Sequence, residues 1–514
     1  MTEREAQLTA ELAHCKAQLE QARLERERFE RENQLLRQKI DLLVRHVFGS
    51  KSERLNPAQM ELLLGAESNV APLPQEPLAP ATPVLPSRPQ RREHAPRLPE
   101  NLPVVEEIID PEPVKANPQN WRLIGQEVSE QLDYEPGRFL RRRLVRRTYV
   151  HRKNLDLAPL TAPLPGKLQD RCIAAPGLLA QVIVSKFCDH IPLYRQEQIF
   201  KTRHKVHLPR QTLDRWVDLA AQWFRPIYNE IRKGVVSGGY VQLDETPIRY
   251  LEPGFGRARQ GYYWVCKKPG GDVLFHWEPS RSSNCLDKII PVDFRGVIQC
   301  DGYGAYPAFV ERRESRIKLA ACWAHVRRKF HKALAQSKRT IGLILRQIQH
   351  LYQIEAQLRQ IKAGPQLRQA VRAHQSRPIV ERIGKALARI KATRRPLPES
   401  LLGDAIDYAE GQWPGLMIFL EDGRVEIDNN LVENAIRPTA IGKKNWMFIG
   451  DKDAGDRGAI LYTIIESCRR QQIDPYAYVR EVLTRLPSMT NQQIAEILPA
   501  AWAKAQLKTL KAAS

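Results

Sequence analysis

Three acidic residues lie in sequence contexts that suit one metal-dependent active site. Asp244 and Asp301 each end a short apolar run, which predicts a carboxylate where a buried strand emerges. Glu433 lies among asparagines in a segment that is predicted to form a short polar helix. Carboxylates from distant parts of a chain can together bind Mg²⁺, which takes oxygen ligands and keeps waters for substrate phosphates. We therefore predict that these three residues bind two Mg²⁺ ions, for which Mn²⁺ can substitute.

Two further acidic residues compete with Glu433 for the third position. Glu426 and Asp428 lie just before it, but Asp428 suits the N-cap of the following helix, so Glu433 is favoured. Pro438 is expected to end that helix, with a basic loop after it at residues 442–446. A positive cradle for DNA is predicted from three residues around this loop, Arg437, Lys443 and Lys444.

The charge of the chain points to a polyanionic partner. Its 514 residues include 80 Lys and Arg against 58 Asp and Glu, a formal net charge of +22. Nucleic acid is the usual partner of so basic a protein, although ribosome-associated and membrane-surface proteins share the feature. No apolar run approaches the ~20 residues of a membrane span, and the N-terminus does not resemble a signal peptide. Eight cysteines without paired spacing indicate reduced thiols, so we expect a cytoplasmic, nucleoid-associated protein without membrane contact.

The N-terminal part is predicted to be a coiled coil and a linker. Residues 3–47 repeat apolar positions in heptads, which favours a self-associating helix and a homo-oligomer; the coiled-coil segment is placed at 1–60. Residues 61–103 form a Pro-rich linker, with ten prolines between Pro72 and Pro103.

Two segments that follow are predicted to contact DNA. Residues 104–160 indicate a small β-rich module with a basic second half, which contains Arg141, Arg142 and Arg143. Residues 170–232 are predicted to be helical, and a short helix, a turn and a further helix after Pro209 suggest a helix-turn-helix. The expected DNA contacts lie near the start of that last helix, at Arg210, Gln211, Thr212 and Arg215.

The remaining pattern predicts a sheet that is interrupted by helices. Three antiparallel strands, followed by alternating helices and strands, describe a ribonuclease-H-like α/β core. Its first and fourth strands lie side by side in such a sheet, so Asp244 and Asp301 should be neighbours. The fold class is thus multidomain α+β, and its C-terminal segments are a first core part (238–325), a helical insertion (326–425), a last core part with Glu433 (426–472) and a helical tail (473–514).

Four motifs resemble the insertion sequence sixty-six family of bacterial transposases, also called the TnpC type. They are the runs Gln242–Ile248, Cys300–Tyr306, Cys322–Phe330 and Asp428–Pro438, the last followed by Gly442–Trp446. The resemblance extends over nearly the whole chain. It implies a DDE-type catalytic domain with a ribonuclease-H fold and a catalytic triad at Asp244, Asp301 and Glu433. The helical insertion between the second Asp and the Glu also matches this family.

One departure from the family concerns zinc. The family usually has a cysteine-rich zinc module between the linker and the helix-turn-helix. Residues 111–125 and 149–154 occupy the places where cysteine pairs would be expected, and neither segment contains cysteine. His151 alone cannot hold Zn²⁺, which takes four ligands, so no zinc is expected.

The resemblance implies a transposase that binds element ends, assembles a multimer, and cleaves and rejoins DNA with Mg²⁺. The partners are the element ends, the target DNA and any helper proteins that the element encodes. Two alternatives stay open: a non-catalytic DNA-binding regulator of the element, and a nuclease of the same fold. Three intact carboxylates facing phosphates argue against the first, since they would repel DNA without metal.

Overall fold

The predicted carboxylates lie within the described residues of the chain. The computed structural model describes residues 172–513 except 314–315 and 394–398, and also 137–141, 148–149, 160–161, 166–170 and scattered positions between 18 and 30. Outside the described residues lie most of the predicted coiled coil, all of the Pro-rich linker and most of the β-rich module. From that module, β1 (Thr148–Tyr149) and β2 (Leu160–Thr161) form an antiparallel pair.

Three helices precede the sheet, as predicted: α4 (Pro176–Phe187), α5 (Leu193–His204) and α6 (Arg210–Val236). Pro176 lies in the first turn of α4, where its missing N–H breaks no helical hydrogen bond. Lys205 ends α5 in the left-handed conformation, with φ of 55°. After Pro209, α6 continues for 27 residues.

Five strands form one mixed sheet: β3 (Tyr240–Tyr250), β4 (Arg259–Lys267), β5 (Val273–Glu278), β6 (Gly296–Gln299) and β7 (Ile317–Ala320). The order across the sheet is β5, β4, β3, β6, β7. The strands β3, β4 and β5 are antiparallel neighbours, whereas β6 and β7 run parallel to β3. The first and fourth strands in chain order therefore lie side by side, as expected from the sequence.

Short elements connect these strands. Gly270, with φ of 74°, forms the predicted turn between β4 and β5. After β5 comes a 3₁₀ helix, η2 (Ser283–Lys288). Between β6 and β7 lies α7 (Ala305–Glu311), close to its predicted position after Tyr303.

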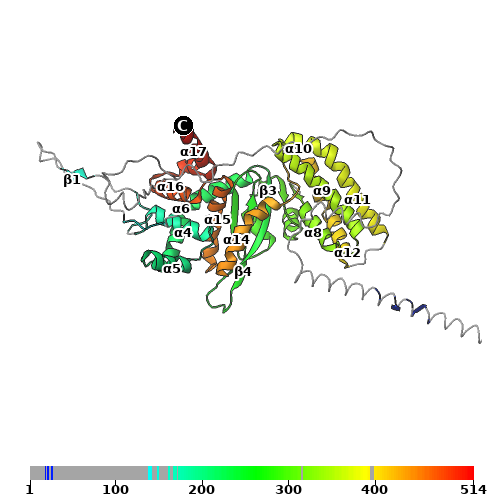
Figure 1. Ribbon diagram of the computed structural model, residues 1–514, viewed down its shortest axis with the longest axis horizontal. Coiled ribbons are helices and arrows are strands. Elements are labelled where there is room, and N and C mark those ends of the chain that lie inside the picture. Colours follow the sequence, from blue (N-terminus) through cyan, green and yellow to red (C-terminus); the bar gives the residue numbers. More distant parts are fainter. Residues whose placement is uncertain are drawn as a thin grey trace, which may run out of the picture. The chain divides into compact units, whose positions relative to one another are not determined.

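Helices from both ends of the core pack on the sheet. Helices α6 and α15 (Lys452–Arg470) contact β5. The hydroxyl of Tyr228 donates to the carbonyl of Phe275 at 3.0 Å, and the hydroxyl of Thr463 accepts from the amide of Phe275 at 2.9 Å. Helix α14 (Asn430–Trp446) contacts β3 and β4 (Figure 1). The helix that carries Glu433 thus rests on the strand that carries Asp244.

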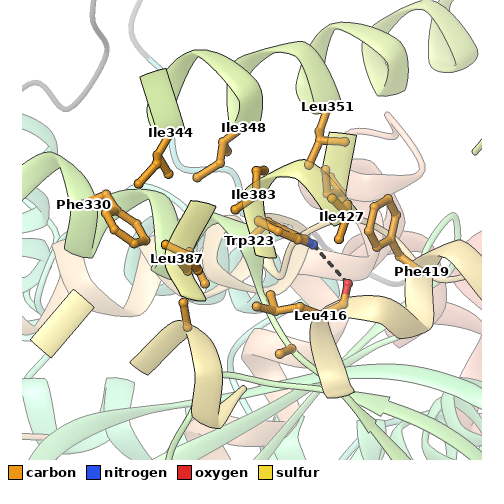
Figure 2. Packing of buried hydrophobic residues seen from close by; sticks show 14 of the residues in the cluster. Trp323, Phe330, Ile344, Ile348, Leu351, Ile383, Leu387, Leu416, Phe419 and Ile427 are labelled. Atoms are coloured by element: carbon orange, nitrogen blue, oxygen red, sulfur yellow. Dashed lines mark hydrogen bonds between the residues drawn. The ribbon is translucent and has the colours of Figure 1, made fainter. Parts of the chain in front are cut away.

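A set of helices lies between β7 and α14, where the helical insertion was predicted. They are α8 (Trp323–Ala333), α9 (Lys338–Gln360), α10 (Pro365–Val371), the π-helical turn η3 (Arg372–Ser376), α11 (Arg377–Ala392), α12 (Leu401–Gly411) and α13 (Trp413–Glu421). Figure 2 shows their shared core, in which Trp323 donates from its indole nitrogen to the carbonyl of Leu416 at 3.1 Å. The same cluster includes Tyr240 and Val297 of the sheet, so the insertion and the sheet share one core.

Two sequence-based expectations about the site elements are wrong. Asp244 does not end its strand, because β3 continues to Tyr250 through a long antiparallel pairing with β4. Pro438 does not end α14, and residues 442–446 are helical instead of forming a loop. A buried proline costs about 3 kcal/mol in a helix interior, but side-chain contacts beyond it hold the second half. In particular, Asn445 donates to the carbonyl of His190 at 2.8 Å.

The chain ends in the expected small helices, α16 (Pro475–Arg485), η4 (Leu486–Ser488), η5 (Asn491–Ile497) and α17 (Pro499–Ala513). Helix α16 packs against α4, and Trp502 of α17 donates to Glu481 at 2.9 Å. Within the described residues, the cysteines are free thiols, in agreement with the expectation. None of the helices in this part of the chain combines the length and the apolar character that crossing a membrane requires.

Candidate active site

Asp244 and Asp301 occupy matching positions on two neighbouring parallel strands. Gln242 of β3 pairs with Gln299 of β6, and each carboxylate follows two residues later in its own segment. Parallel strands that share a register bring such residues to the same end of the pair. The two aspartates therefore lie toward the same end of the β3–β6 pair.

Buried polar side chains of this strand pair hold the segment that leads into α14. The amide nitrogen of Gln299 donates to the carbonyl of Glu426 at 2.7 Å. The amide nitrogen of Gln242 donates to the carbonyl of Asp428 at 2.9 Å. The hydroxyl of Tyr240 accepts from the backbone amide of Glu426 at 2.9 Å. These bonds fix the path of the chain just before the third carboxylate.

Glu433 lies in the first turn of α14, directly after this fixed segment. Asn429, the residue before the helix, donates from its side chain to the carbonyl of Leu243 at 3.0 Å. Leu243 precedes Asp244, so the start of α14 is tied to the residue next to the first aspartate. A short, buried hydrogen-bonded connection of this kind restricts where Glu433 can lie relative to β3.

The three predicted carboxylates share one electrostatic environment. Burial is the main reason that the pKa of Asp244 is raised to about 8. The negative charges of Glu245, Asp301 and Glu433 raise that pKa in the same direction. Carboxylates that repel one another in a desolvated position are stabilised by a cation between them. The charges of Asp301 and Glu433 thus act on the Asp244 carboxyl, although among the described residues the ligand atoms of these three do not all lie within 4.8 Å of one another.

Backbone amides orient two of these carboxylates. One oxygen of Asp244 accepts from the amide of Glu245 at 2.9 Å, and one oxygen of Asp301 accepts from the amide of Tyr303 at 3.0 Å. A carboxylate held at one oxygen presents the other in a defined direction. Carboxylate oxygens are the ligands that Mg²⁺, a hard cation, takes. One of the three carboxylates, Glu433, also has a basic neighbour, since Arg328 lies 3.8 Å from it. The residues present thus fit the predicted metal.

Two basic side chains of α8 face Glu433. Nδ1 of His325 lies 3.8 Å from Oε1 of Glu433, and Arg328 lies 3.8 Å from the other carboxylate oxygen. From the sequence, this stretch was recognisable only as a family motif, and neither side chain had a predicted role. The signal that could have identified His325 is the placement of a histidine and two arginines in one helix turn of a motif shared with a catalytic family.

Cys322, His325 and Glu433 also form a group of possible metal ligands. One ligand atom of each residue lies within 4.8 Å of the other two, and among the described residues this is the group that meets that condition. The Cys322 thiol is an unfavourable member, because burial raises its pKa to about 12 and its sulfur accepts from the amide of Asn429 at 3.3 Å. His325 is therefore the stronger additional candidate.

The two competitors of Glu433 have other partners. Glu426 is paired with Arg368 at 2.9 Å and with Arg359 at 3.4 Å. Asp428 accepts from the backbone and side-chain nitrogens of Asn430, at 3.1 and 2.7 Å. Asp428 is not the N-cap itself, since Asn429 occupies that position. Glu433, in contrast, is an acidic residue of this segment whose charge contributes to the raised pKa of Asp244.

Glu245 has a structural environment that differs from that of Asp244. It is buried, accepts from the hydroxyl of Tyr306 at 2.6 Å and from Nε of Arg281 at 2.9 Å. Side chains alternate between the two faces along a strand, so neighbouring residues such as Asp244 and Glu245 belong to opposite faces of β3. Its partners in α7 and after β5 give it the role of a buried ion-pair partner.

The predicted DNA-contacting residues of α6 lie at its first turns. Arg210, Gln211 and Arg215 are exposed, and Thr212 is half-buried. Trp216 and Leu213 are buried on the other side of the same helix. This segregation leaves a polar surface at the N-terminus of α6.

The other predicted DNA contacts have mixed environments. Arg437 and Lys444 are exposed on α14, and Arg141 is exposed. Lys443 donates to the carbonyl of Pro247 at 3.2 Å, and burial lowers its pKa, so it has a structural contact as well. Arg142 and Arg143 lie outside the described residues.

Comparisons with sequence families agree over most of the chain. Residues 171–457 match the profile described as "Transposase IS66 family", and residues 463–500 match "IS66 C-terminal element". Residues 35–106 match "Transposase C of IS166 homeodomain". The first match includes all three predicted carboxylates. The third includes part of the predicted coiled coil and linker, where the sequence analysis placed no DNA-binding fold.

Three curated proteins of Sinorhizobium fredii (strain NBRC 101917 / NGR234) are similar to this chain. The uncharacterized protein y4jD is 33% identical over 493 residues, which cover 91% of this chain and 94% of that protein. The uncharacterized protein y4qI is 32% identical over 403 residues, covering 74% and 72%. The uncharacterized protein y4hP is 28% identical over 508 residues, covering 93% and 90%.

Proposed function

Because this chain belongs to the IS66 family of transposases, we propose that it is an active enzyme which cleaves element ends and joins them to target DNA. The observation that carries this proposal concerns the Asp244 carboxyl, whose pKa is raised by burial and also by the charges of Asp301 and Glu433. The three residues come from β3, the segment after β6 and the first turn of α14.

The sheet supports a ribonuclease-H-like catalytic core. Its three antiparallel strands come first in the chain, and two parallel strands follow on the other side of the first. That order was the one expected for such a core. The insertion of helices between β7 and α14 agrees with the family pattern that the motifs suggest.

The proposed chemistry is attack of an oxygen nucleophile on a phosphodiester. Asp244, Asp301 and Glu433 would hold Mg²⁺ ions, which activate the attacking oxygen and stabilise the leaving oxygen. The backbone amides of Glu245 and Tyr303 keep the two aspartates oriented. Water and the terminal 3′-hydroxyl of a cut strand are alternative nucleophiles at the same site, so cleavage and strand transfer require no second set of catalytic residues.

DNA is the proposed substrate and partner. The net charge of +22 attracts a polyanion, and exposed basic residues lie on α6 and α14 near the core. The homeodomain-like match at residues 35–106 adds a second candidate for DNA recognition. Self-association through residues 3–47 and helper proteins from the same element remain part of this proposal.

The experiment that tests the function uses labelled element ends and purified full-length protein with Mg²⁺. We expect cleavage followed by joining to a target plasmid, and loss of both in the Asp301→Asn protein, since Asn keeps the volume but not the charge. Binding to the labelled ends should persist in that variant. Cleavage at wild-type rate by Asp301→Asn would exclude the proposed site.

The same assay separates the two alternative functions. A nuclease of this fold would cut the ends without joining them to the target. A non-catalytic regulator would bind the ends and leave them intact in both the wild-type and the variant protein.

A further inference from the structure

A fully buried arginine helps to join the helical insertion to the segment before Glu433. Arg372 begins the π-helical turn η3 and is fully buried, with 0% exposure. Its guanidinium donates to both carboxylate oxygens of Glu355 in α9, at 2.6 and 2.8 Å. Its third nitrogen, Nη1, donates to the carbonyls of Phe419 and Val425, both at 2.8 Å. Arg372 thus bonds α9, the end of α13 and the chain beyond α13 together.

The geometry of these bonds requires an arginine. A guanidinium offers several donors in a rigid plane, which can grip a carboxylate with two bonds and still reach two carbonyls. Bonds from Arg372 and Arg368 lower the pKa of Glu355 although burial opposes this shift. The pair is therefore charged and fully desolvated, which makes loss of one partner costly.

A second arginine extends the connection toward the active site. Arg368 of α10 lies 3.1 Å from Glu355 and 2.9 Å from Glu426. Glu426 belongs to residues 422–429, which we name the Glu433 lead-in. Gln369 adds a bond to the carbonyl of Glu421 at 2.8 Å, just before the lead-in.

The sheet holds the lead-in from another direction. As described above, Gln299 and Gln242 donate to the carbonyls of Glu426 and Asp428. The lead-in is therefore bonded by arginines of the insertion and by amides of the strands that precede the aspartates. Glu433 follows in the first turn of α14.

We propose that the insertion positions Glu433, with Arg372 as the main positioning residue and Arg368 as the second. The bonds from the insertion hold the lead-in against the β3–β6 pair. These contacts set the distance of Glu433 from Asp244 and Asp301. The proposal rests on the proposed function only for the catalytic role of Glu433. The positioning itself is a property of the fold and can be measured without DNA.

One glycine allows this contact to be loosened without touching a charged group. At Gly423, in the lead-in, an added Cβ would lie 1.8 Å from the carbonyl oxygen of Pro365 and 3.1 Å from the amide of Gln369. The Gly423→Ala substitution must therefore push α10 away from the lead-in. Gly364, next to Pro365, has no atom within 4 Å of an added Cβ, so Gly364→Ala is the matched control.

Two measurements on the full chain test the proposal. The first is hydrogen–deuterium exchange of peptides from the lead-in and the first turn of α14, followed by mass spectrometry. The second is single-turnover cleavage at saturating DNA. We expect Gly423→Ala to increase exchange in these peptides and to lower the cleavage rate about 10- to 100-fold, since small misplacements of a reacting group have effects of this size. DNA affinity and exchange of β4 should stay unchanged, and Gly364→Ala should match the wild type.

Arg368→Gln provides a milder change if Gly423→Ala does not fold, since it removes one link and leaves Arg372 in place. It should give a smaller increase of exchange in the same peptides. Unchanged exchange in the lead-in and α14 while α10 exchanges faster, or a normal cleavage rate despite faster exchange, would overturn the positioning role. If the wild-type protein binds element ends without cleaving them, the proposed function fails, whereas the exchange comparison still decides the positioning.

Discussion

Nδ1 of His325 lies 3.8 Å from Oε1 of Glu433, and among the described residues neither buried atom has a hydrogen-bond partner. Leaving two such atoms buried and unsatisfied is costly, so an additional cation or proton between them would be stabilising. This relationship links the motif on α8 to the third carboxylate of the proposed site. His325 is therefore a candidate member of the active site.

We expect His325→Ala to lower the single-turnover cleavage rate about 10- to 100-fold, the usual range for residues that orient a metal ligand. The loss should be smaller than that caused by Glu433→Gln, which removes a proposed ligand itself. His350→Ala on α9 is a control for the loss of a partly buried histidine elsewhere. Equal rates for the His325 and His350 variants would show that His325 has no part in the site.

The raised pKa of Asp244 predicts a pH-dependent stability in the absence of metal. An unfolded aspartate ionises near pH 4, whereas burial raises the pKa of folded Asp244 to about 8. Between these values the folded state retains a proton that the unfolded state has lost. Stability should therefore fall as the pH rises from about 4 to about 8.

Thermal unfolding in EDTA between pH 5 and 8 measures this effect. The Asp244→Asn variant lacks the titrating group, so its advantage over the wild type should grow with pH. Mg²⁺ at pH 8 should stabilise the wild type more than the variant. Parallel pH profiles for the two proteins would contradict the assignment of this group.

Glu245 should behave as a structural residue. Its buried carboxylate is bonded to Tyr306 and Arg281, so Glu245→Ala should lower the free energy of unfolding by about 1–3 kcal/mol. Chemical denaturation measures this loss. Cleavage below the unfolding transition should be reduced less than in Asp244→Asn, and a complete loss of cleavage in a folded Glu245→Ala protein would place Glu245 among the catalytic groups.

Base recognition is predicted for the first turns of α6. Alanine at Gln211 or Arg215 should cost about 1–3 kcal/mol at one base position, as loss of a bidentate base contact does. Alanine at Lys444 should instead weaken all sequences alike and flatten the salt dependence. Competition binding with mutated element ends distinguishes these effects. If the α6 variants keep their sequence preference, the element ends are recognised by another segment, and residues 35–106 are the next candidate.

Self-association is predicted for residues 3–47, whose heptad seam would otherwise expose apolar side chains. Light scattering should give a multiple of the chain mass for the full-length protein and a lower multiple for a variant without residues 1–60. The same multiple in both proteins would place the oligomer interface elsewhere.

Local patterns in the sequence were sufficient to indicate the strands, but not the full length of β3. The expectation that the first and fourth strands are neighbours came from the ribonuclease-H-like template. The apolar runs before Asp244 and Asp301, together with the turn at Gly270, predicted segments that are indeed β-strands. Helix boundaries at Pro176 and Pro209 were also accessible, because proline restricts its own backbone and that of its neighbour.

Contacts between distant parts of the chain were not accessible in the same way. Arg372 is one arginine among many in a basic helical region, and only its burial against Glu355 distinguishes it. The continuation of α14 through Pro438 depends on packing against β3 and β4, which a local rule for proline does not contain. The pairing of His325 with Glu433 likewise requires the fold.

The length of α6 has a consequence for the DNA that the proposed transposase can process. The helix extends for 27 residues, about 40 Å, from the polar first turns to the end that leads into β3. It packs against β5 and α15, so its first turn is held at a fixed distance from the sheet. A base that is read at its first turn would therefore lie at a fixed interval from the bond that is cut. Adding or removing a few base pairs between the two in an element end should abolish cleavage even when both sequences are intact.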